Sequence, residues 1–330
     1  MEAKKLNRQQ LQILYSLGRT TLNFWYIVRK VNGTLKDLQN NLKELETKGL
    51  IGFDGKNFSL KKELPQRPDF DKLVESFRKY ADMRPPPKSD FFQDPLVTED
   101  LFNRVKLLYN RGDLEGRDIF ILGDDDLFSI ALFMTGLPNK IVVVEIDTRV
   151  TDVIKKIAKK NNFNIEVLEY NCADPLPSSF KGKYDVFVMD PVETEKGFAA
   201  FLSRGVEALR HPGAVYFGLT EIDCPSILWH KFQRDINKMN LITTDMLPKF
   251  NFYDEQIEGL SKEQFMKHQS YYDTMKLFRK SPFNLSYPDI NWYHSTFIRL
   301  ETVGKPKPLI KKNIKFDDSF YVNDYVMTTD

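Results

Sequence analysis

The sequence predicts an α/β protein in which a doubly wound, Rossmann-like sheet follows a small winged-helix domain. Three observations predict this. Apolar runs of strand length alternate with helical segments from about residue 98, helices and then a hairpin fill residues 1–62, and a proline-marked segment joins the two parts. Strands buried on both faces read as continuous apolar runs, so the alternation indicates a mostly parallel sheet with helices on both sides.

The composition is that of an ordinary globular protein. The chain has 330 residues, of which 42% are hydrophobic and 28% charged, enough for one large and one small domain. Its apolar runs are too short for a membrane helix, and no apolar run follows the basic N-terminus as in a secretory signal. Cys172 and Cys224 stand far apart and the four histidines are scattered. We therefore expect a reduced, cytoplasmic protein without a metal site.

Residues 1–62 carry the pattern of a winged helix, in which helices precede a small hairpin. Apolar residues recur at helical spacing, Thr34 is placed to cap a helix, and Gly49 to end it. An Asp-Gly-Lys turn joins two short β-rich runs. The expected elements are helices over 11–17, 22–31 and 35–48, and strands over 50–53 and 57–60.

The charge of this head differs from that of the remaining chain. Residues 1–62 hold twelve basic and five acidic residues, a net charge of +7, whereas the rest carries −5. Winged helices often bind DNA through their third helix. Here the lysines of that helix are balanced by acids, and it has no arginine. We therefore expect the head to serve dimerisation or to cover a substrate, and not to bind nucleic acid.

The rest of the chain divides into a proline-rich connection, residues 63–97, and a Rossmann-like domain with a C-terminal tail, residues 98–330. The connection contains one expected helix, 70–80, and an extended Arg-Pro-Pro-Pro-Lys run. In the larger domain we expect strands over 118–122, 140–146, 165–169, 184–189, 213–219 and 292–300, and helices over 98–109, 127–135, 149–160 and 195–208. Ligands of such sheets bind at the carboxyl ends of the strands.

An unusual acidic turn follows the first strand of the larger domain. Gly123 keeps the glycine that lets the backbone approach a nucleoside, but Asp124, Asp125 and Asp126 come directly after it. Adjacent carboxylates repel one another unless a cation or hydrogen-bond donors compensate. One of them has a structural alternative, as a cap of the helix that begins near Leu127. We predict that Gly123, Asp124 and Asp125 contact the co-substrate.

The ends of the next two strands carry further acids. Glu145 and Asp147 point to the same side of the second strand, and either suits hydrogen bonds from ribose hydroxyls; Glu145 is preferred. Asp174 follows the third strand, where an adenine amino group is read in related folds. As an aspartate before Pro175 it also has a plain turn interpretation.

The fourth strand ends in Asp190-Pro191-Val192-Glu193-Thr194, which places two more carboxylates at the same edge. The apolar strand before Asp190 predicts that this side chain is partly desolvated and suited to accept a proton. A strand-end Asp-Pro is also ordinary turn chemistry. The assignment of Asp190 and Glu193 to a site therefore depends on their convergence with the acids of the other strands.

The charge of these strand ends indicates the ligand. S-adenosylmethionine carries a carboxylate, which a triple-aspartate turn would repel, whereas its decarboxylated form presents only a sulfonium and an ammonium. A polyamine acceptor adds further positive charges. An acidic site therefore selects a cationic donor and a cationic acceptor together. The residues predict aminopropyl transfer, with decarboxylated S-adenosylmethionine as co-substrate and no tightly bound cofactor.

These residues resemble a known family, the branched-chain polyamine synthases of thermophilic archaea and bacteria, or N4-bis(aminopropyl)spermidine synthases. The likeness covers most of the chain: the head, the proline-rich linker, the Gly-Asp-Asp-Asp turn at 123–126 and the Asp-Pro-x-Glu-Thr turn at 190–194. Arg-Gly-Asp-Leu at 111–114 and Tyr-Phe-Gly-Leu-Thr at 216–220 are similar too. The chain departs from the family at Val192, where a second proline is usual.

The resemblance implies an aminopropyltransferase of the methyltransferase-like fold. It would modify the internal nitrogen of spermidine to N4-aminopropylspermidine and then to quaternary N4-bis(aminopropyl)spermidine, releasing methylthioadenosine. It also implies a homodimer and a thermophilic source. The family's pattern assigns catalytic roles to Asp174, Asp126 and Asp190, and brings the linker residues Asp90 and Gln93 to the substrate beside Glu193.

Two other functions fit parts of the sequence. An S-adenosylmethionine-dependent methyltransferase is one, because Asp190-Pro191 is similar to the strand-end motif of enzymes that methylate bases. Those enzymes usually continue with an aromatic residue that stacks on a flipped base, where this chain has Val192 and Glu193. The other is a DNA-binding regulator whose α/β domain senses a ligand, which strongly salt-dependent DNA affinity without turnover would favour.

Overall fold

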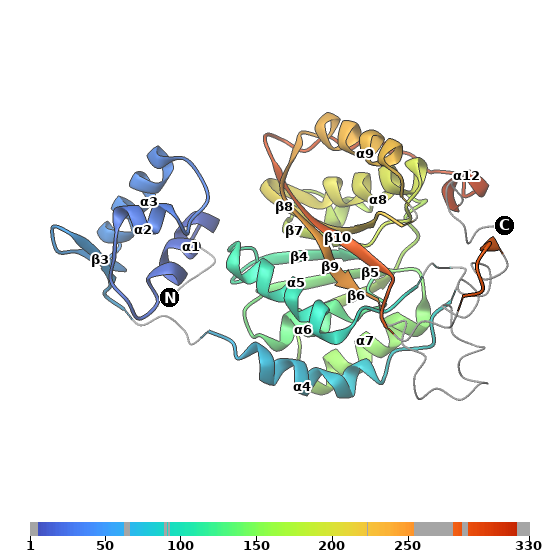
Figure 1. Ribbon diagram of the computed structural model, residues 1–330, viewed down its shortest axis with the longest axis horizontal. Helices are drawn as coiled ribbons and strands as arrows, with labels where there is room; N and C mark the ends of the chain where they lie inside the picture. Colours follow the sequence, from blue (N-terminus) through green and yellow to red (C-terminus); the bar gives the residue numbers. More distant parts are fainter. Residues whose placement is uncertain are drawn as a thin grey trace.

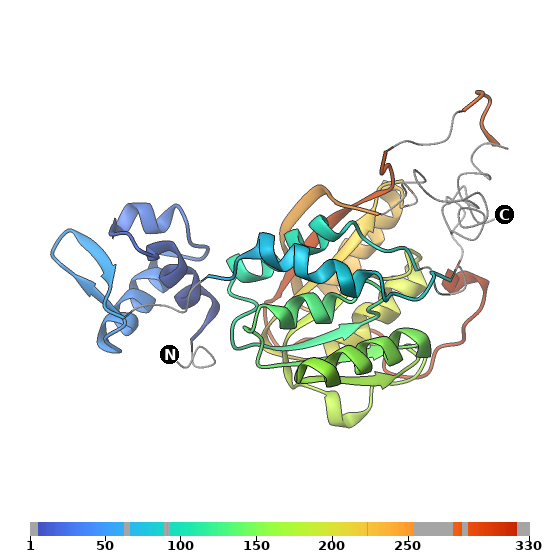
Figure 2. The same cartoon turned by 90° about the horizontal axis from the view of Figure 1, so that it is seen from below.

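A small N-terminal head and a larger α/β domain lie side by side in the computed structural model, with helix α4 running from the head along the domain (Figures 1 and 2). The structure describes residues 6–62, 67–88, 91, 93–222, 224–253, 280–285 and 290–321. In these ranges no helix is both long enough and apolar enough to cross a membrane.

The head consists of short helices packed on a three-stranded antiparallel sheet with the strand order β1-β3-β2. Thr34 caps α3 as predicted, because its side chain accepts a hydrogen bond from the backbone of Asp37. The helix expected over 22–31 is wrong in its bounds, since residues 22–23 pair with β3. The designation as a winged helix stays a prediction. The elements are α1 (Arg8–Leu17), β1 (Leu22–Asn23), α2 (Phe24–Val28), α3 (Leu35–Thr47), β2 (Ile51–Phe53) and β3 (Asn57–Leu60).

The larger domain is built on a seven-stranded sheet with the order β6-β5-β4-β7-β8-β10-β9. Neighbours from β6 to β8 pair in parallel, and β10 runs antiparallel to both β8 and β9. This confirms the predicted doubly wound sheet. The strands are β4 (Asp118–Leu122), β5 (Lys140–Glu145), β6 (Ile165–Glu169), β7 (Tyr184–Met189), β8 (Leu209–Thr220), β9 (Leu241–Phe252) and β10 (His294–Thr302).

Helices cover both faces of the sheet, so its strands are buried on both sides (Figure 1). Ile119 and Ile121 of β4 pack in one apolar cluster with the first helix group, and Phe120 and Leu122 in a second cluster with the other. This alternation explains why β4 reads as a continuous apolar run. The first group is α4 (Phe70–Ala81), α5 (Thr98–Asn110), α6 (Phe128–Met134) and α7 (Thr148–Asn161); the second is α8 (Glu195–Ala208), α9 (Ser226–Lys238) and α12 (Asp318–Tyr321).

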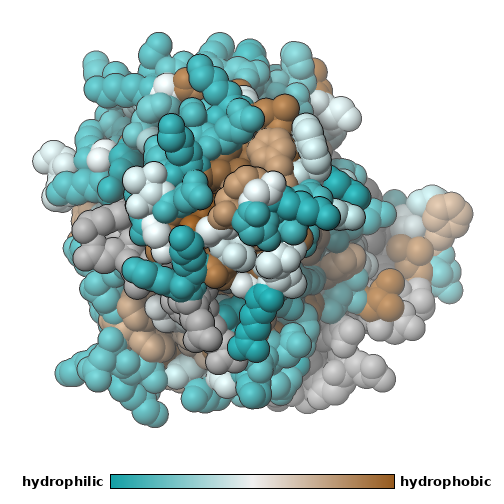
Figure 3. All heavy atoms as spheres, turned by 90° about the vertical axis from the view of Figure 1, so that its left-hand side faces the viewer, coloured by the Kyte–Doolittle hydropathy of each residue, from teal (hydrophilic) through white to brown (hydrophobic). Residues whose placement is uncertain are grey.

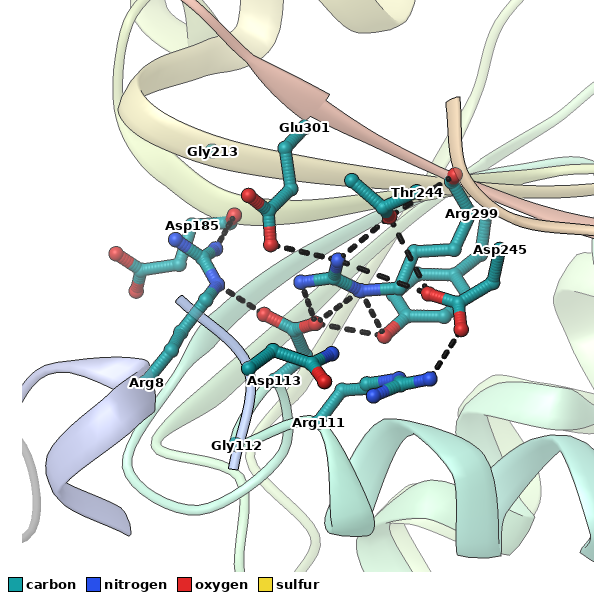
Figure 4. A network of polar contacts seen from close by, with 12 residues as sticks. Arg8, Arg111, Gly112, Asp113, Asp185, Gly213, Thr244, Asp245, Arg299 and Glu301 are labelled. Atoms are coloured by element: carbon teal, nitrogen blue, oxygen red, sulfur yellow. Dashed lines mark hydrogen bonds and ion pairs between the residues drawn. The ribbon is translucent and has the colours of Figure 1, made fainter. Parts of the chain in front are cut away.

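The head contacts the domain through a buried ionic network, shown in Figure 4. Arg8 of α1 pairs with Asp113, and its Nη2 donates to the backbone oxygen of Asp185 at 2.8 Å. Asp113 also accepts from Arg299 Nε at 2.9 Å and from the hydroxyl of Tyr216 at 2.6 Å. Burial alone would raise the pKa of Asp113, but the two arginines and the tyrosine hold it well below its usual range.

This contact places the head at the edge of the sheet where the parallel strands begin. Asp113 precedes β4, and Asp185 is the second residue of β7. Asp190, the first residue after β7, is five residues further on, about 17 Å away at the usual rise of a strand. The expectation that the head covers the substrate is therefore wrong for the site of its own chain.

Candidate active site

The acids predicted from the sequence come together at the carboxyl edge of the sheet. Asp125 and Asp126 follow β4, Glu145 ends β5, and Asp190 follows β7. Because β5, β4 and β7 are adjacent parallel strands, their ends meet at one edge. The charges of Asp126, Glu145 and Asp190 all act on Asp125. The structure thus assembles a cluster of carboxylates from segments up to 65 residues apart.

Glu145 holds the β4–α6 turn in place. Its Oε2 accepts from the backbone N–H of Asp124 at 2.8 Å, and its Oε1 from that of Asp147 at 2.9 Å. Gly123 turns the chain here with a φ of +80°, a conformation that L side chains rarely adopt. Burial raises the pKa of Glu145. Each carboxylate oxygen keeps a further lone pair, so Glu145 is still able to accept a ribose hydroxyl.

Asp124 serves the turn itself. Its side chain is buried and accepts from the backbone N–H of Ser129 at 3.1 Å and from the Ser129 hydroxyl at 2.5 Å. Burial raises the pKa of Asp124 to about 8. The structural alternative noted for one of the three aspartates, a cap at the start of α6, therefore applies to Asp124. Contact of this residue with the co-substrate stays a prediction.

Asp125 and Asp126 differ in their partners. Asp126 Oδ1 accepts from the backbone N–H of Leu96 at 2.7 Å, and its backbone oxygen accepts from Arg84 at 2.9 Å. Asp125 has no hydrogen bond or ion pair with any residue in the described ranges, although it is largely shielded from water. Burial and then the neighbouring carboxylates raise the pKa of Asp125 well above its usual value. Burial also raises the pKa of Asp126, which Arg84 and Arg104 partly oppose.

Asp190 is held by a fully buried arginine of α5. Its Oδ2 accepts from Arg104 Nη1 at 2.6 Å, and its Oδ1 accepts from the backbone N–H of Gly218 at 3.0 Å. The side chain of Asp190 is 39% exposed, so it is only partly removed from water, as the sequence predicts. Its role as a proton acceptor stays a prediction.

Glu193 and Thr194 of the same turn have different roles. Glu193 accepts from the backbone N–H of Thr220 at 2.6 Å and from its hydroxyl at 2.5 Å. Thr194 caps α8 through a hydrogen bond from the backbone N–H of Gly197 at 2.8 Å. Glu193 is thereby fixed beside the carboxyl end of β8, next to the site formed by β4 and β7.

Asp147 is engaged by the proline-rich connection. It caps α7, pairs with Arg149 at 2.6 Å and accepts from Gln93 Nε2 at 3.1 Å. The linker residue Gln93 thus reaches the carboxyl edge of the sheet, and ligand contact by Gln93 and Asp147 stays a prediction. Asp90, predicted beside Gln93, lies outside the described residues.

Asp174 lies apart from the other acids. It is exposed on the loop after β6, where its Oδ1 accepts from Asn313 of the C-terminal segment at 2.8 Å. The order β6-β5-β4-β7 separates the ends of β6 and β7 by three strand spacings, or about 14 Å. Asp174 thus follows a strand that is not adjacent to β7, and the two roles predicted for it, at the adenine and in catalysis, stay predictions.

Several residues of the site were not found from the sequence. Three of them are Arg84 in the connection, Arg104 in α5 and Tyr253 directly after β9. Arg84 bonds to the backbone of Asp126, and Arg104 is linked to Tyr253 through Asn251 and Ser295. They lie in segments distant from the acidic turns, and a single sequence gives no signal that they meet. In the part of the chain that the structure describes, no group of three or more His, Cys, Asp or Glu side chains is arranged to hold a metal ion.

Strand order and site together define an α/β protein of the methyltransferase-like fold, with a cluster of carboxylates at the carboxyl edge of its sheet. The chain belongs to the branched-chain polyamine synthase family. The family's sequence profile, described as the branched-chain polyamine synthase A C-terminal domain, matches residues 72–328.

Relatives with the name N(4)-bis(aminopropyl)spermidine synthase match over most of the chain. The protein of Thermococcus kodakarensis is 35% identical over 241 residues, which are 72% of this chain and 65% of that protein, just under two thirds of its length. The protein of Methanocaldococcus jannaschii is 34% identical over 279 residues, 84% of this chain and 73% of its own.

A solved structure of the same family has a similar fold. The branched-chain polyamine synthase of Thermus thermophilus, in complex with N4-aminopropylspermidine and 5′-methylthioadenosine, is 28% identical. It matches with a TM-score of 0.67 over 94% of this chain and 91% of that one. A Pyrococcus horikoshii structure with a methyltransferase name is 16% identical at a TM-score of 0.50, which shows the fold alone.

Proposed function

We propose that this protein transfers aminopropyl groups from decarboxylated S-adenosylmethionine to the internal nitrogen of spermidine. The products are N4-aminopropylspermidine, then quaternary N4-bis(aminopropyl)spermidine, and methylthioadenosine. Membership of the branched-chain polyamine synthase family supports this, and so does the bound product of the Thermus thermophilus relative. The observation that carries the proposal in this chain is the carboxylate cluster of Asp125, Asp126 and Asp190 at adjacent strand ends.

The nucleoside half of the donor lies over β4 and β5 in this proposal. Gly123 lets the backbone approach it, and Glu145 accepts the ribose hydroxyls. Asp147, together with Gln93 of the proline-rich connection, contacts the nucleoside on this side. Asp174 contacts it from the loop after β6. The sulfonium then points toward β7, and Asp125 and Asp126 of the β4–α6 turn lie on the side where ordinary S-adenosylmethionine would carry its carboxylate.

The polyamine half lies between β4 and β7. Spermidine is positively charged at neutral pH, and Asp125, Asp126, Asp190 and Glu193 supply opposite charges from two neighbouring turns. Holding the acceptor against the donor provides much of the rate acceleration in a displacement, since it converts a bimolecular step into a unimolecular one. The internal nitrogen must lose its proton before it attacks, which requires one of these carboxylates as a base.

Mass spectrometry tests the reaction directly. The protein is incubated with spermidine and decarboxylated S-adenosylmethionine, and we expect products heavier by one or two aminopropyl units that fragment as branched at the internal nitrogen. A linear product would keep the reaction class and refute the internal acceptor. No product, with intact S-adenosylmethionine bound instead, would favour a methyltransferase. Salt-dependent DNA binding without turnover would favour a regulator.

The homodimer is part of the same proposal. The head exposes Trp25 (66%), Tyr26 (54%), Leu35 (51%) and Phe53 (48%), and Figure 3 shows apolar side chains in a band across this face. Exposed apolar patches on a globular protein often mark interfaces. Light scattering should give twice the chain mass of 38.6 kDa. Leu35→Glu should shift it to the monomer, whereas Arg19→Glu, an exposed control on the head, should not.

A cytoplasmic location completes the proposal. Cys172 is a free thiol and Cys224 is buried as well, as is usual for cysteines of proteins in a reducing compartment. Fractionation of the source cells should recover the protein with cytosolic markers, and recovery with membranes or medium would refute it.

A further inference from the structure

Arg104 is a buried cation beside a site that must bind cations. Its side chain is 1% exposed; Nη1 donates to Asp190 Oδ2 at 2.6 Å, and Nε donates to Asn251 Oδ1 at 2.9 Å. The guanidinium carbon lies 4.7 Å from the centroid of the Phe297 ring. A buried charge is stable only when its partners are fixed. Arg104 is therefore placed to hold Asp190 in one orientation.

A polar network from β9 and β10 supports Arg104 from behind. Asn251 Nδ2 donates to Ser295 Oγ at 2.8 Å, and the Tyr253 hydroxyl donates to the same oxygen at 3.2 Å. Burial raises the pKa of Tyr253 well above its usual value, and the charge of Asp190 adds to this, so the hydroxyl stays protonated. The amide of Asn251 bonds to Ser295 through its nitrogen and to Arg104 Nε through its oxygen. Arg104 Nε therefore has a fixed acceptor, which restricts rotation of the guanidinium group.

Asp190 is fixed from its other oxygen by the backbone of β8. A Cβ at position 218 would lie 3.0 Å from Asp190 Oδ1 and 3.3 Å from Arg104 Nη2, so a side chain there would crowd both groups. Both oxygens of Asp190 thus accept from donors that are themselves fixed, one on Arg104 and one on the backbone of β8. The carboxylate is thereby held in one orientation at the carboxyl edge of the sheet, where it can attract a cation.

Asp125 has the opposite environment. It accepts no hydrogen bond within the described ranges and is half-buried, so Arg84 is the one protein group there that favours its charged form. Three carboxylates from neighbouring strand ends face it and disfavour that form. When two acids of one site lie in different environments, one can act as the base and the other as an electrostatic partner. The charged groups that act on Asp125 are Asp126, Glu145, Asp190 and Arg84.

We propose that Arg104 is a positioning residue of the transfer, which fixes the Asp190 carboxylate in one orientation as an electrostatic partner of the polyamine and leaves Asp125 as the base. This rests on the proposed aminopropyl transfer. The protonated internal amine of spermidine gives its proton to the Asp125 carboxylate. The freed lone pair forms a bond to the propyl carbon next to the sulfonium, the carbon–sulfur bond breaks, and its electron pair stays on sulfur in neutral methylthioadenosine. The product nitrogen is a tertiary ammonium.

The pH dependence of kcat tests which acid is the base. In Asp125→Asn we expect kcat at pH 7 to fall about 10²- to 10⁴-fold, the usual contribution of a general base. Higher pH should restore much of it, because the free-amine fraction of spermidine rises. In Asp190→Asn we expect mainly a higher KM for spermidine and a wild-type pH profile of kcat. Rescue of Asp190→Asn by high pH, and not of Asp125→Asn, would overturn the proposal.

A double-mutant cycle tests whether Arg104 acts through Asp190. Arg104→Met should lower kcat/KM for spermidine about 10- to 100-fold, as expected for misplaced reacting groups. In the Asp190→Asn background the same change should cost less than about threefold, because coupled residues are not additive. Arg104→Lys keeps the charge but cannot donate to Asp190 and Asn251 together, so it should lie between. Independent effects that multiply would overturn the role assigned to Arg104.

Controls distinguish failure of this proposal from failure of the proposed aminopropyl transfer. Absence of aminopropylated product from the wild-type protein would refute the proposed function itself, before any variant is compared. Binding of methylthioadenosine, measured by calorimetry, and the melting temperature report the fold of each variant. If Arg104→Met does not fold, Arg104→Lys takes its place in the cycle, and the pH profiles of Asp125→Asn and Asp190→Asn decide the assignment of the base.

Discussion

At the scale of single residues, neighbouring carboxylates of the β4–α6 turn have different partners. Asp124 is bonded to Ser129, Asp126 to the connection, and Asp125 to no described residue. Their shared sequence pattern, three consecutive aspartates, does not distinguish them. Only the folded structure shows that Asp124 bonds to the first turn of α6 and that Asp125 has no partner among the described residues, so substitutions of the three should have distinct effects.

Asp124 should make stability depend on pH. Its pKa is raised from 3.8 to about 8 in the folded state, so the folded protein binds its proton more tightly than the unfolded chain. Its contribution to stability is therefore greatest below pH 4 and is lost as the pH rises toward 8, by about 1 kcal/mol per pH unit within that window. Between pH 5 and 8 the melting temperature of the wild type should therefore fall relative to that of Asp124→Asn, which has no titrating group at this position. The exposed control Asp152→Asn should show no such trend, and a constant difference for Asp124→Asn would contradict the prediction.

Asp174 should contribute to nucleoside binding more than to chemistry. Because it lies three strand spacings from Asp190, we expect Asp174→Asn to weaken methylthioadenosine binding about tenfold, the value of one hydrogen bond to a charged group. Its kcat should stay within about threefold of the wild type. Calorimetry and steady-state kinetics measure the two effects. A loss of kcat above a hundredfold with unchanged binding would instead support the catalytic role that the family resemblance implies.

At the scale of elements, the sequence predicted best what is buried and regular. Strands β6 and β7 and helix α8 have the predicted bounds, because each is an apolar or amphipathic run between clear turn signals. Strand β9 was not predicted. Its alternation is interrupted by Pro248, and at the edge of the sheet it needs no continuous apolar run. Such edge strands depend on their neighbours more than on their own residues.

The site was predictable to the same extent. Each acid was found because it follows a recognisable strand, and parallel strands place their carboxyl ends together. Arg104 was not found, since α5 reads as an ordinary amphipathic helix and its partners Asn251 and Ser295 come from strands about 150 or more residues later. Contacts of that kind follow from the packing of the whole sheet and leave no local pattern.

The attachment of the head should matter for stability and little for catalysis. Arg8→Met removes one of the two arginines on Asp113, and Arg299 and Tyr216 remain. We expect a loss of about 2 kcal/mol in the free energy of unfolding, typical of a hydrogen bond to a charged group. Because the contact lies at the amino edge of the sheet, kcat at 25 °C should stay within about twofold.

Chemical denaturation and initial rates measure these two effects. Arg19→Met, at an exposed head position, is the matched control and should change neither. A stable Arg8→Met variant with strongly reduced kcat would show that the head influences the site of its own chain, against the position observed.

At the scale of the whole molecule, charge is divided between a basic head and an acidic remainder. The body carries a net charge of −5, and its acids gather where the proposed cationic substrates bind. A negative field draws the cationic spermidine toward the sheet edge. It also attracts the basic head of a second chain. The division therefore serves substrate capture and is compatible with association through the head.

Ionic strength should reveal this field. The Debye length falls from about 10 Å at 0.1 M salt to about 3 Å at 1 M, so attraction between spermidine and the carboxylates should weaken. We expect KM for spermidine to rise several-fold over this range, and less steeply in Asp190→Asn, which has lost the carboxylate that Arg104 holds in place. Methylthioadenosine is neutral, so its dissociation constant, measured by calorimetry in the same buffers, should change little and serves as the control. If both ligands weaken in parallel, salt acts on the fold and not on the charges of the site. If neither weakens, the cluster at the carboxyl edge does not bind the polyamine through its charge, and shape would have to account for the acceptor.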